Sequence, residues 1–202
     1  MPERIEIEIK LRAPSAAEAG RRLLKLRAKL HEKRHFEENT LYDDGARSLQ
    51  RRGDLLRLRL RQDVEGGFLT YKGPPPRLLP GAKVRTEIEV HLDDPAALDR
   101  ILRRLGFMPS YRYQKYRTVF KAGGLLVSLD ELPFGCFIEL EGPKRAIDAV
   151  ARRLGYKPED HILLNYRSLH IQHLRERGLP DQDLLFPHSA RHAGSSGSSG
   201  RA

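Results

Sequence analysis

Several short segments of this chain alternate strictly between charged and apolar residues, and this alternation limits the possible folds more than any other feature. The first such segment, Glu6–Leu11, reads Glu-Ile-Glu-Ile-Lys-Leu. Because successive side chains of a β-strand point to opposite faces, Glu6, Glu8 and Lys10 share one face and the apolar residues share the other. The sequence therefore predicts a sheet with one charged face and one apolar face.

The same period of two, together with helix start and stop signals, gives the order of elements. Further strands are expected at 56–61, 68–72, 85–90, 111–120, 125–130 and 136–141, with an extended stretch near 35–42. Four helices are expected among them. The first follows the Ser15/Glu18 capping box and runs to about Leu30, and the second begins at Asp94-Pro95. The third begins at Pro143, and the fourth lies around Asn165–Arg177. The fold class is therefore α+β.

The charged face carries residues of both signs. By strand parity it includes Glu6, Glu8, Lys10, Arg57, Arg59, Arg85, Glu87, Glu89, Lys115, Arg117, Glu139 and Glu141, with Lys72 and Asp130 at the ends of their strands. An antiparallel sheet with one face in water shows the same alternation, and for any single strand that is the commoner explanation. Two features of the whole set favour an enclosed face instead. These positions are almost all charged, with little Thr, Ser or Gln, and three helices with apolar stripes need the opposite face to pack on.

An up-and-down antiparallel barrel of eight strands, with the helices outside, satisfies both features and turns the charged face inward. Burying so many charges costs several kcal/mol per ion if they are unpaired, and apolar residues usually stabilise a core as well or better. A ligand is a better explanation of a charged interior than stability. Carboxylates are the oxygen ligands that Mg²⁺ or Mn²⁺ prefers, while Arg and Lys bind phosphate oxygens. The residues therefore predict a site for a polyphosphate together with a divalent metal.

Composition is consistent with this interpretation and excludes several other classes. Of 202 residues, 39% are hydrophobic and 32% are charged, and the net charge of +10 favours acidic partners. No apolar run is long enough to span a membrane, and no signal peptide is evident. The single cysteine, Cys136, allows no internal disulfide, so we expect a cytoplasmic protein. Residues 178–202, which include the Gly/Ser linker Gly194–Gly200, are expected to form a disordered tail.

An ordered series of motifs resembles the CYTH superfamily, also called triphosphate tunnel metalloenzymes. It begins with the Glu-x-Glu-x-Lys of residues 6–10 and covers roughly residues 3 to 170, and on this basis we assign 1–177 to one CYTH domain. The motifs that follow in order are Leu56-Arg57-Leu58-Arg59, Thr70-Tyr71-Lys72-Gly73-Pro74, Arg85-Thr86-Glu87-Ile88-Glu89, Lys115-Tyr116-Arg117, Leu129-Asp130-Glu131-Leu132 and Phe134 to Gly142. Features such as Tyr166 are most similar to the class IV adenylate cyclase-like branch.

The resemblance implies an eight-stranded tunnel that holds a triphosphate with Mg²⁺ or Mn²⁺. Carried over residue by residue, it implies metal ligands at Glu6, Glu8, Asp130, Glu139 and Glu141. It implies phosphate ligands at Lys10, Arg57, Arg59, Lys72, Lys115 and Arg117, with supporting roles for Arg85, Glu87 and Glu89.

The motifs do not separate the two activities of the superfamily. Attack of water on the terminal phosphorus would make the protein a triphosphatase, which we favour slightly. Attack of a ribose 3′-hydroxyl on the α-phosphorus would make it an adenylate cyclase. A non-enzymatic binder of nucleic acid or polyphosphate is a third interpretation, prompted by the basic first and second helices, although such helix faces are more often simply solvated. We expect a small-molecule triphosphate as the partner rather than nucleic acid or a membrane, and monomer and homodimer both remain open.

Overall fold

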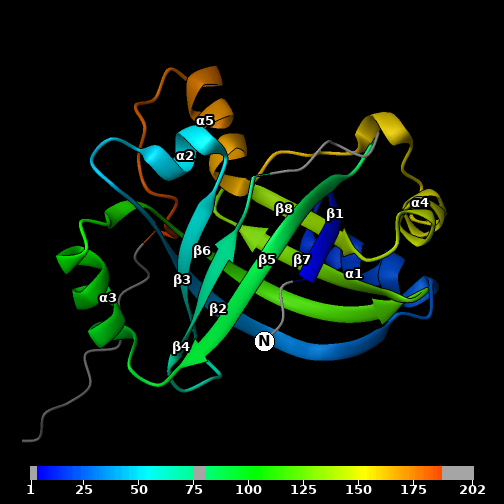
Figure 1. Ribbon diagram of the computed structural model, residues 1–202. Coiled ribbons are helices and arrows are strands. Elements are labelled where there is room, and N and C mark those ends of the chain that lie inside the picture. Colours follow the sequence, from blue (N-terminus) through cyan, green and yellow to red (C-terminus); the bar gives the residue numbers. More distant parts are fainter. Residues whose placement is uncertain (1–3, 75–80, 188–202) are drawn as a thin grey trace, which may run out of the picture.

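The charged and apolar faces of the strands close into a barrel in the computed structural model, which describes residues 4–74 and 81–187 (Figure 1). Within these residues, eight strands form one closed sheet in the order β1-β5-β4-β3-β2-β6-β7-β8, and every neighbouring pair is antiparallel. The strands are β1 Arg4–Ala13, β2 Lys29–Asp43, β3 Leu55–Arg61, β4 Gly67–Lys72, β5 Lys83–Leu92, β6 Met108–Ala122, β7 Leu125–Leu132 and β8 Gly135–Glu141. The predicted eight-stranded antiparallel barrel of an α+β protein is confirmed.

The N-terminal strand closes the barrel. β1 pairs with β5 through the register Glu6↔Arg85 and with β8 through Lys10↔Glu139. Because paired residues share a face of the sheet, the charged faces of these three strands point the same way. Glu6, Lys10 and Arg85 are buried and line the interior cavity, so this shared face points into the barrel. The alternative of a sheet face exposed to water is therefore wrong.

Five α-helices and one 3₁₀ turn lie outside the strands in the described residues. Ser15, Asp94 and Asn165 act as N-caps, because each side chain accepts the backbone N–H three residues further on. The helices are α1 Ala16–Lys25, α2 Ser48–Arg52, α3 Pro95–Arg104, α4 Lys144–Arg153 and α5 Tyr166–Glu176, with the 3₁₀ turn η1 at Pro158–Asp160.

The apolar face of the barrel packs under helices. Leu23 of α1 and Ile147 of α4 are fully buried against Ile9, Ile138 and Leu140 of β1 and β8. A separate cluster places α3 against β2 and β3. These contacts remove many of the outward-facing aliphatic side chains from water, which stabilises the charged-in, apolar-out arrangement. Ile5, Ile88 and Val90 of the same outward face remain exposed.

Helix α5 lies across one end of the barrel beside α2 (Figure 1). Tyr166 and Leu169 pack against Tyr111, Leu132 and Phe137, whose side chains fill this end of the interior. The ring centroids of Tyr166 and Phe137 are 5.5 Å apart in an edge-on arrangement. The charged interior is therefore bounded at this end by an aromatic cluster.

Three parts of the chain differ from the sequence predictions. Helix α1 ends at Lys25 rather than near Leu30, because Arg27 takes a left-handed conformation (φ 58°) and Leu30 already pairs with β6. The short helix α2 was not predicted. It begins after Asp43, whose carboxylate accepts the backbone N–H groups of residues 44, 49 and 50.

The third difference is in the segment expected to be a disordered tail. Residues 183–186 lie beside β6, where Leu184 is buried and exchanges backbone hydrogen bonds with Arg112 and Gln114. Asp183 also accepts from the Arg112 side chain at 2.7 Å. The structure thus shows contacts with β6 in part of the segment expected to be a disordered tail, and the expected Gly194–Gly200 linker lies outside the described residues.

No helix in the described parts of the chain is long and apolar enough to cross a membrane.

Candidate active site

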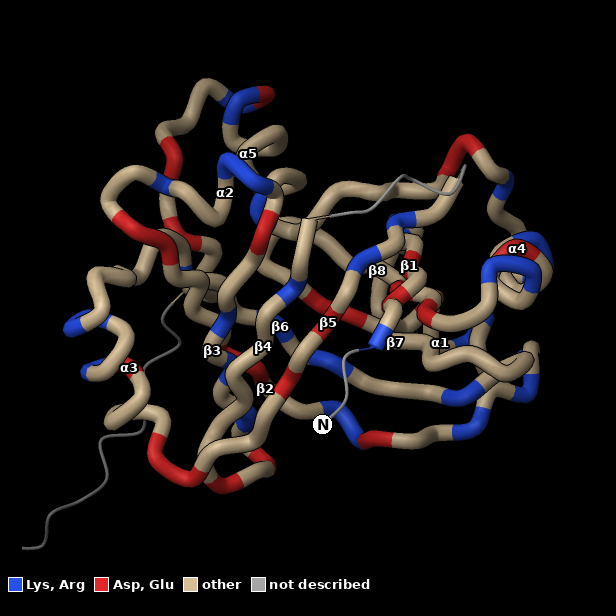
Figure 2. Tube along the Cα trace, viewed as in Figure 1, with Lys and Arg blue, Asp and Glu red and all other residues tan. Residues whose placement is uncertain are grey.

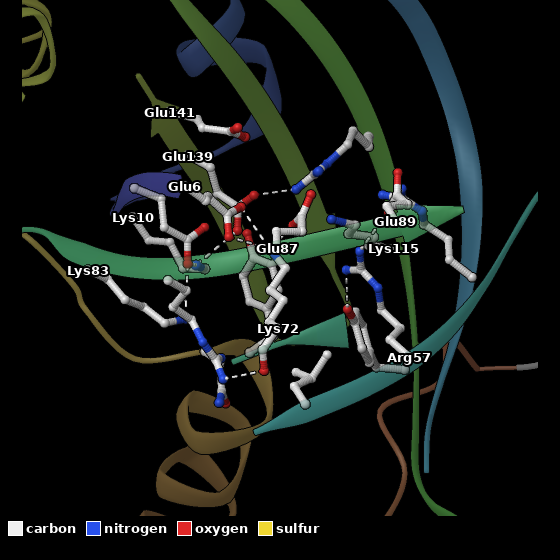
Figure 3. A pocket seen from close by; sticks show the side chains of 18 of the residues that line it. Glu6, Lys10, Arg57, Lys72, Lys83, Glu87, Glu89, Lys115, Glu139 and Glu141 are labelled. Carbon is white, nitrogen blue, oxygen red and sulfur yellow. Dashed lines mark hydrogen bonds and ion pairs between the residues drawn. The ribbon is translucent and has the colours of Figure 1, made fainter. Parts of the chain in front are cut away.

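The barrel interior holds a cavity of about 110 Å³ whose walls are mostly charged side chains (Figure 3). Along the chain, positions of Lys and Arg and positions of Asp and Glu both occur on the strands of the barrel (Figure 2). Among the described residues, nine basic and six acidic side chains line it, an excess of three positive charges. Such an excess favours a polyanionic ligand. The basic residues are Arg4, Lys10, Arg57, Arg59, Lys72, Lys83, Arg85, Lys115 and Arg117, and the acidic residues are Glu6, Glu8, Glu87, Glu89, Glu139 and Glu141.

The structure brings together all but one of the site residues suggested by the sequence. The exception is Asp130, which is fully buried behind the cavity wall. Its carboxylate accepts from Lys115 Nζ at 3.1 Å, from Arg117 Nε and Nη2 at 2.7 and 2.6 Å, and from the Tyr166 hydroxyl at 2.7 Å. In this arrangement Asp130 orients two cavity-lining cations, and its expected role as a metal ligand stays a prediction.

Lys10 joins the carboxylates of β1 and β8. Its ammonium lies 3.0 Å from Glu8 Oε1 and 3.1 Å from Glu139 Oε1. Burial raises the pKa of both carboxyls, but Lys10 and the neighbouring cations outweigh it and hold each pKa below its ordinary value. Both carboxylates are therefore ionised at neutral pH, which metal coordination requires.

A second lysine connects β1 to β4 and β5. Lys72 Nζ lies 2.5 Å from Glu6 Oε2 and 2.6 Å from Glu87 Oε2 (Figure 3). Burial raises the pKa of Glu87, and Lys72 and Arg4 more than reverse that effect, so that its pKa falls to about 2. Glu87 is therefore also ionised at neutral pH.

Glu141 and Lys83 titrate closest to neutrality. Burial and the nearby Glu6 carboxylate raise the pKa of Glu141 to about 7. Burial lowers the pKa of Lys83 to about 8, although its ammonium lies 3.0 Å from Glu8 Oε1. The Glu141 carboxyl is therefore only partly ionised at neutral pH.

The opposite wall is basic. Arg57 Nη2 donates to Thr70 Oγ1 at 3.1 Å, and Arg59 Nη2 donates to Glu89 Oε2 at 2.8 Å. The Nε atoms of both arginines are buried and have no hydrogen-bond partner within the described structure. Unsatisfied donors in a buried site are costly, and an anion in the cavity is the natural acceptor for them.

Arg85 has a different role from the other arginines. Its guanidinium donates to the backbone carbonyl oxygens of Gly73 at 2.7 Å and Lys72 at 3.2 Å, and also to Gly53. These bonds connect the end of β4 to the turn before β3. The supporting role that the resemblance implied for Arg85 stays a prediction.

Several residues at the site were not singled out from the sequence for a role. Glu37 is 1% exposed and lies between Lys115 and Arg59, at 3.4 and 3.8 Å. Lys83, Tyr113 and Asn165 line the cavity. Lys83 lies two residues before Arg85 in β5 and therefore falls on the same face of the strand. The alternation in the sequence could thus have identified Lys83.

The carboxylates suit a divalent cation in number and chemistry, although they do not form a ready-made cluster. Among the described residues, no group of three or more His, Cys, Asp or Glu side chains is arranged to hold a metal ion. Mg²⁺ commonly takes only one or two protein carboxylates and completes its shell with phosphate oxygens and water. Glu8 and Glu139, with Glu6 and Glu141 on the same cavity wall, provide such carboxylates. The residues therefore fit a metal that binds together with a phosphate ligand.

Comparison with known proteins agrees with this geometry. The CYTH domain family model matches residues 4–162. The chain belongs to the CYTH family. A Methanocaldococcus jannaschii protein named "Putative adenylate cyclase" is 32% identical over 139 residues, which cover 68% of this chain and 76% of the relative.

Solved structures share the fold of this CYTH protein. A "putative adenylate cyclase" from Vibrio parahaemolyticus superposes with a TM-score of 0.71 at 20% identity, covering 83% of this chain and 98% of that one. A Hippeastrum protein, described as a "putative adenylyl cyclase" with "a dominant" triphosphatase activity, superposes with a TM-score of 0.59 at 21% identity, covering 88% and 97%. At these identities the likeness is one of fold.

Proposed function

We propose that this CYTH protein is a divalent-metal-dependent triphosphatase that hydrolyses a triphosphate bound inside the barrel. The observation that carries the proposal is the composition of the enclosed cavity, with a basic wall from β3 and β6 facing paired carboxylates from β1 and β8. The activity described for the Hippeastrum relative supports hydrolysis.

The basic wall would bind and align the phosphate chain. Arg57, Arg59 and Arg117 present guanidinium groups that match phosphate oxygens, while Lys115 adds a point charge. Their positions are fixed by hydrogen bonds before any ligand enters, which reduces the reorganisation required on binding.

The acidic residues would hold the metal. Glu8 and Glu139 are the leading ligands, with Glu6 and Glu141 beside them, and Mg²⁺ or Mn²⁺ would supply charge neutralisation at the phosphate oxygens. Lys10, which now lies between Glu8 and Glu139, would be displaced toward the phosphates or share the carboxylates with the metal.

A class IV adenylate cyclase is the second candidate, favoured by the name of the archaeal relative at 32% identity. The same cavity would bind ATP, and the reaction would release pyrophosphate rather than phosphate. The two activities differ in the nucleophile and in the phosphorus atom that it attacks: water attacks the terminal phosphorus in a triphosphatase, and the ribose 3′-hydroxyl attacks the α-phosphorus in a cyclase. Both use the same charged groups of the wall.

Product analysis separates these candidates. The purified protein would be given ATP, thiamine triphosphate or inorganic tripolyphosphate with Mg²⁺ or Mn²⁺, and cyclic AMP, pyrophosphate and phosphate would be assayed separately. Phosphate release without cyclic AMP is expected. Cyclic AMP formed at a rate comparable to phosphate release would reverse the assignment in favour of the cyclase.

Carboxylate variants test whether the cavity is the site. Glu6→Ala and Glu139→Ala are expected to lower activity by about 10–100-fold or more while the protein remains folded. Glu159→Ala, which alters an exposed glutamate of η1, is the matched control and should retain activity. Full activity in the two cavity variants would place the reaction elsewhere.

Nucleic-acid binding is tested by salt dependence. A polyelectrolyte site on the basic helices would weaken steeply with salt. Tight, salt-sensitive binding of DNA or RNA, with no triphosphate turnover, would favour the third interpretation over an enzyme.

A further inference from the structure

Among the described residues that line the charged cavity, Tyr166 is the only one that belongs to a helix. It is the first residue of α5, and all the other lining residues lie in strands of the barrel except Asn165, which caps the same helix. Tyr166 is 6% exposed and carries no charge. The phosphate and metal roles described above do not use it, so its presence in a charged wall requires an explanation.

The chain before α5 fixes where the Tyr166 ring lies. The backbone of Lys10 in β1 donates to Ile162 O at 3.0 Å and accepts from Ile162 N at 2.8 Å. Asn165 then begins the helix by accepting a backbone N–H three residues further on. The ring packs edge-on against Phe137 of β8, with 5.5 Å between the centroids. These contacts set the position of the ring before any ligand enters the cavity.

The ring of Tyr166 lies against two lysines of the cavity wall. Lys10 Nζ is 5.3 Å from the ring centroid and Lys115 Nζ is 5.5 Å from it (both lysines are labelled in Figure 3). The negative face of an aromatic ring attracts a cation within about 6 Å, and more strongly when the cation is buried, as both of these side chains are. A carboxylate partner neutralises a cation, whereas a neutral ring holds it and leaves its charge available to a phosphate. The ring therefore does not compete with the ligand for these lysines.

The hydroxyl of Tyr166 acts on the basic wall through Asp130. It donates to Asp130 Oδ2 at 2.7 Å, and the same oxygen accepts from Lys115 at 3.1 Å and from Arg117 Nη2 at 2.6 Å. Burial and the Asp130 charge raise the pKa of Tyr166 well above its ordinary value, so the hydroxyl stays protonated and remains a donor. By occupying part of the Asp130 carboxylate, it limits how strongly that carboxylate draws the two cations away from the cavity.

From these contacts we propose that Tyr166 is a positioning residue for triphosphate binding, whose ring holds the ammonium groups of Lys10 and Lys115 at the cavity without neutralising them. The inference rests on the proposed function in one respect, because it assumes that a triphosphate occupies the cavity. It does not depend on which nucleophile attacks. If Tyr166 only filled the end of the barrel, the shape of its side chain would matter and the electron density of its ring would not.

The test changes the electron density of the ring and keeps its shape. Tyr166→Phe and its analogues with one, two or three ring fluorines would be compared with the wild type, because each fluorine weakens the negative face of the ring. Calorimetry without divalent metal would measure the dissociation constant for inorganic tripolyphosphate. It should rise about threefold in Tyr166→Phe and about tenfold more across the fluorinated series.

Phe137 provides the matched control. It is 0% exposed and packs on Tyr166, but it does not line the cavity. The same fluorinated phenylalanines at position 137 should change the dissociation constant by less than about twofold. Urea unfolding of every variant would show that the folded state is retained, so that a change in binding is not a loss of folded protein.

Turnover of ATP and tripolyphosphate with Mg²⁺, measured in parallel, separates the two proposals. If fluorination at position 166 weakens binding but the wild type hydrolyses no triphosphate, the proposed function fails and the inference holds. If the wild type hydrolyses triphosphate but fluorination at position 166 changes binding no more than at position 137, the inference is wrong and the proposed function holds. A wild type that does not bind tripolyphosphate would overturn both.

Discussion

Replacing Lys115 by methionine tests directly whether the charged interior behaves as a low-dielectric environment. Lys115 is 2% exposed and its ammonium lies between two buried carboxylates, Asp130 at 3.1 Å and Glu37 at 3.4 Å. Methionine retains most of the volume of lysine and removes the charge, so the loss is electrostatic rather than a cavity effect.

The two carboxylates would be affected unequally. Asp130 retains two bonds from Arg117 and one from Tyr166. Glu37 retains only His35 Nε2 at 3.3 Å and Arg59 at 3.8 Å. Glu37 is therefore left with a buried, poorly compensated charge, and removing one partner of a buried pair costs about 3–5 kcal/mol.

The assay is equilibrium urea unfolding at neutral pH without ligand, with Lys144→Met as the matched control. Lys144 forms an ion pair with Asp148 one turn along α4, at 2.5 Å, but both side chains are partly exposed. Such a pair contributes about 0.3–0.5 kcal/mol. The free energy of unfolding should fall by about 3–5 kcal/mol in Lys115→Met and by under about 1 kcal/mol in the control. Equal effects in the two variants would refute the reasoning, because the barrel interior would then screen charge as the surface does.

Three further perturbations test other parts of the structure. Burial and the Glu6 carboxylate raise the pKa of Glu141 to about 7. The contribution of Glu141 to the free energy of unfolding is therefore greatest below the unfolded pKa of about 4.5 and is lost as pH rises toward 7. Glu141→Gln should flatten that decline when urea unfolding is measured as a function of pH. Gly66→Ala should lower the free energy of unfolding by about 1–3 kcal/mol, because φ of Gly66 is +81° and an added Cβ would collide with a neighbouring backbone carbonyl. Gly45→Ala should leave it unchanged, because an added Cβ there has no atom within 4 Å. Equal thermal midpoints for the two variants would contradict this prediction. Leu184→Ala should lower the free energy of unfolding by about 2–4 kcal/mol, because the Leu184 side chain is buried where the C-terminal segment packs against β6. Leu179 is 46% exposed, so Leu179→Ala should have little effect. No difference between the two variants would mean that residues 178–187 do not stabilise the fold.

Strand parity alone was enough to predict most of the residues that line the cavity. In β1, β5 and β8 the period of two is unbroken, so Glu6, Arg85 and Glu139 could be assigned to one face before their partners were known. The helices with apolar stripes needed the apolar face of the sheet to pack on. A closed barrel with the helices outside meets that need and places the charged face inside. The mixture of charges on the other face indicated a ligand.

Parity failed where the strand is irregular. β2 contains register shifts between Glu32 and His35, and Glu37 and Glu38 are both acidic, so no alternation marks Glu37 as the inward residue. Asp130 shows a different limit. Its parity is inward, but only the packing of Lys115 and Arg117 in front of it places it behind the cavity wall. Likewise α2 depends on the Asp43 carboxylate reaching forward to backbone groups, a contact that no helical periodicity indicates.

The position of β1 between β5 and β8 has a consequence for how the protein folds. The first strand of the chain finds its two neighbours about 80 and 130 residues later, so ring closure depends on contacts of long sequence separation, which form slowly. We expect β1 to pair last, so that the carboxylates of β1 and β8 meet at that closing step. Whatever binds between them binds only the completed ring and stabilises it by mass action. In refolding experiments, acquisition of ligand binding should therefore coincide with the final step and be absent from any partly paired intermediate.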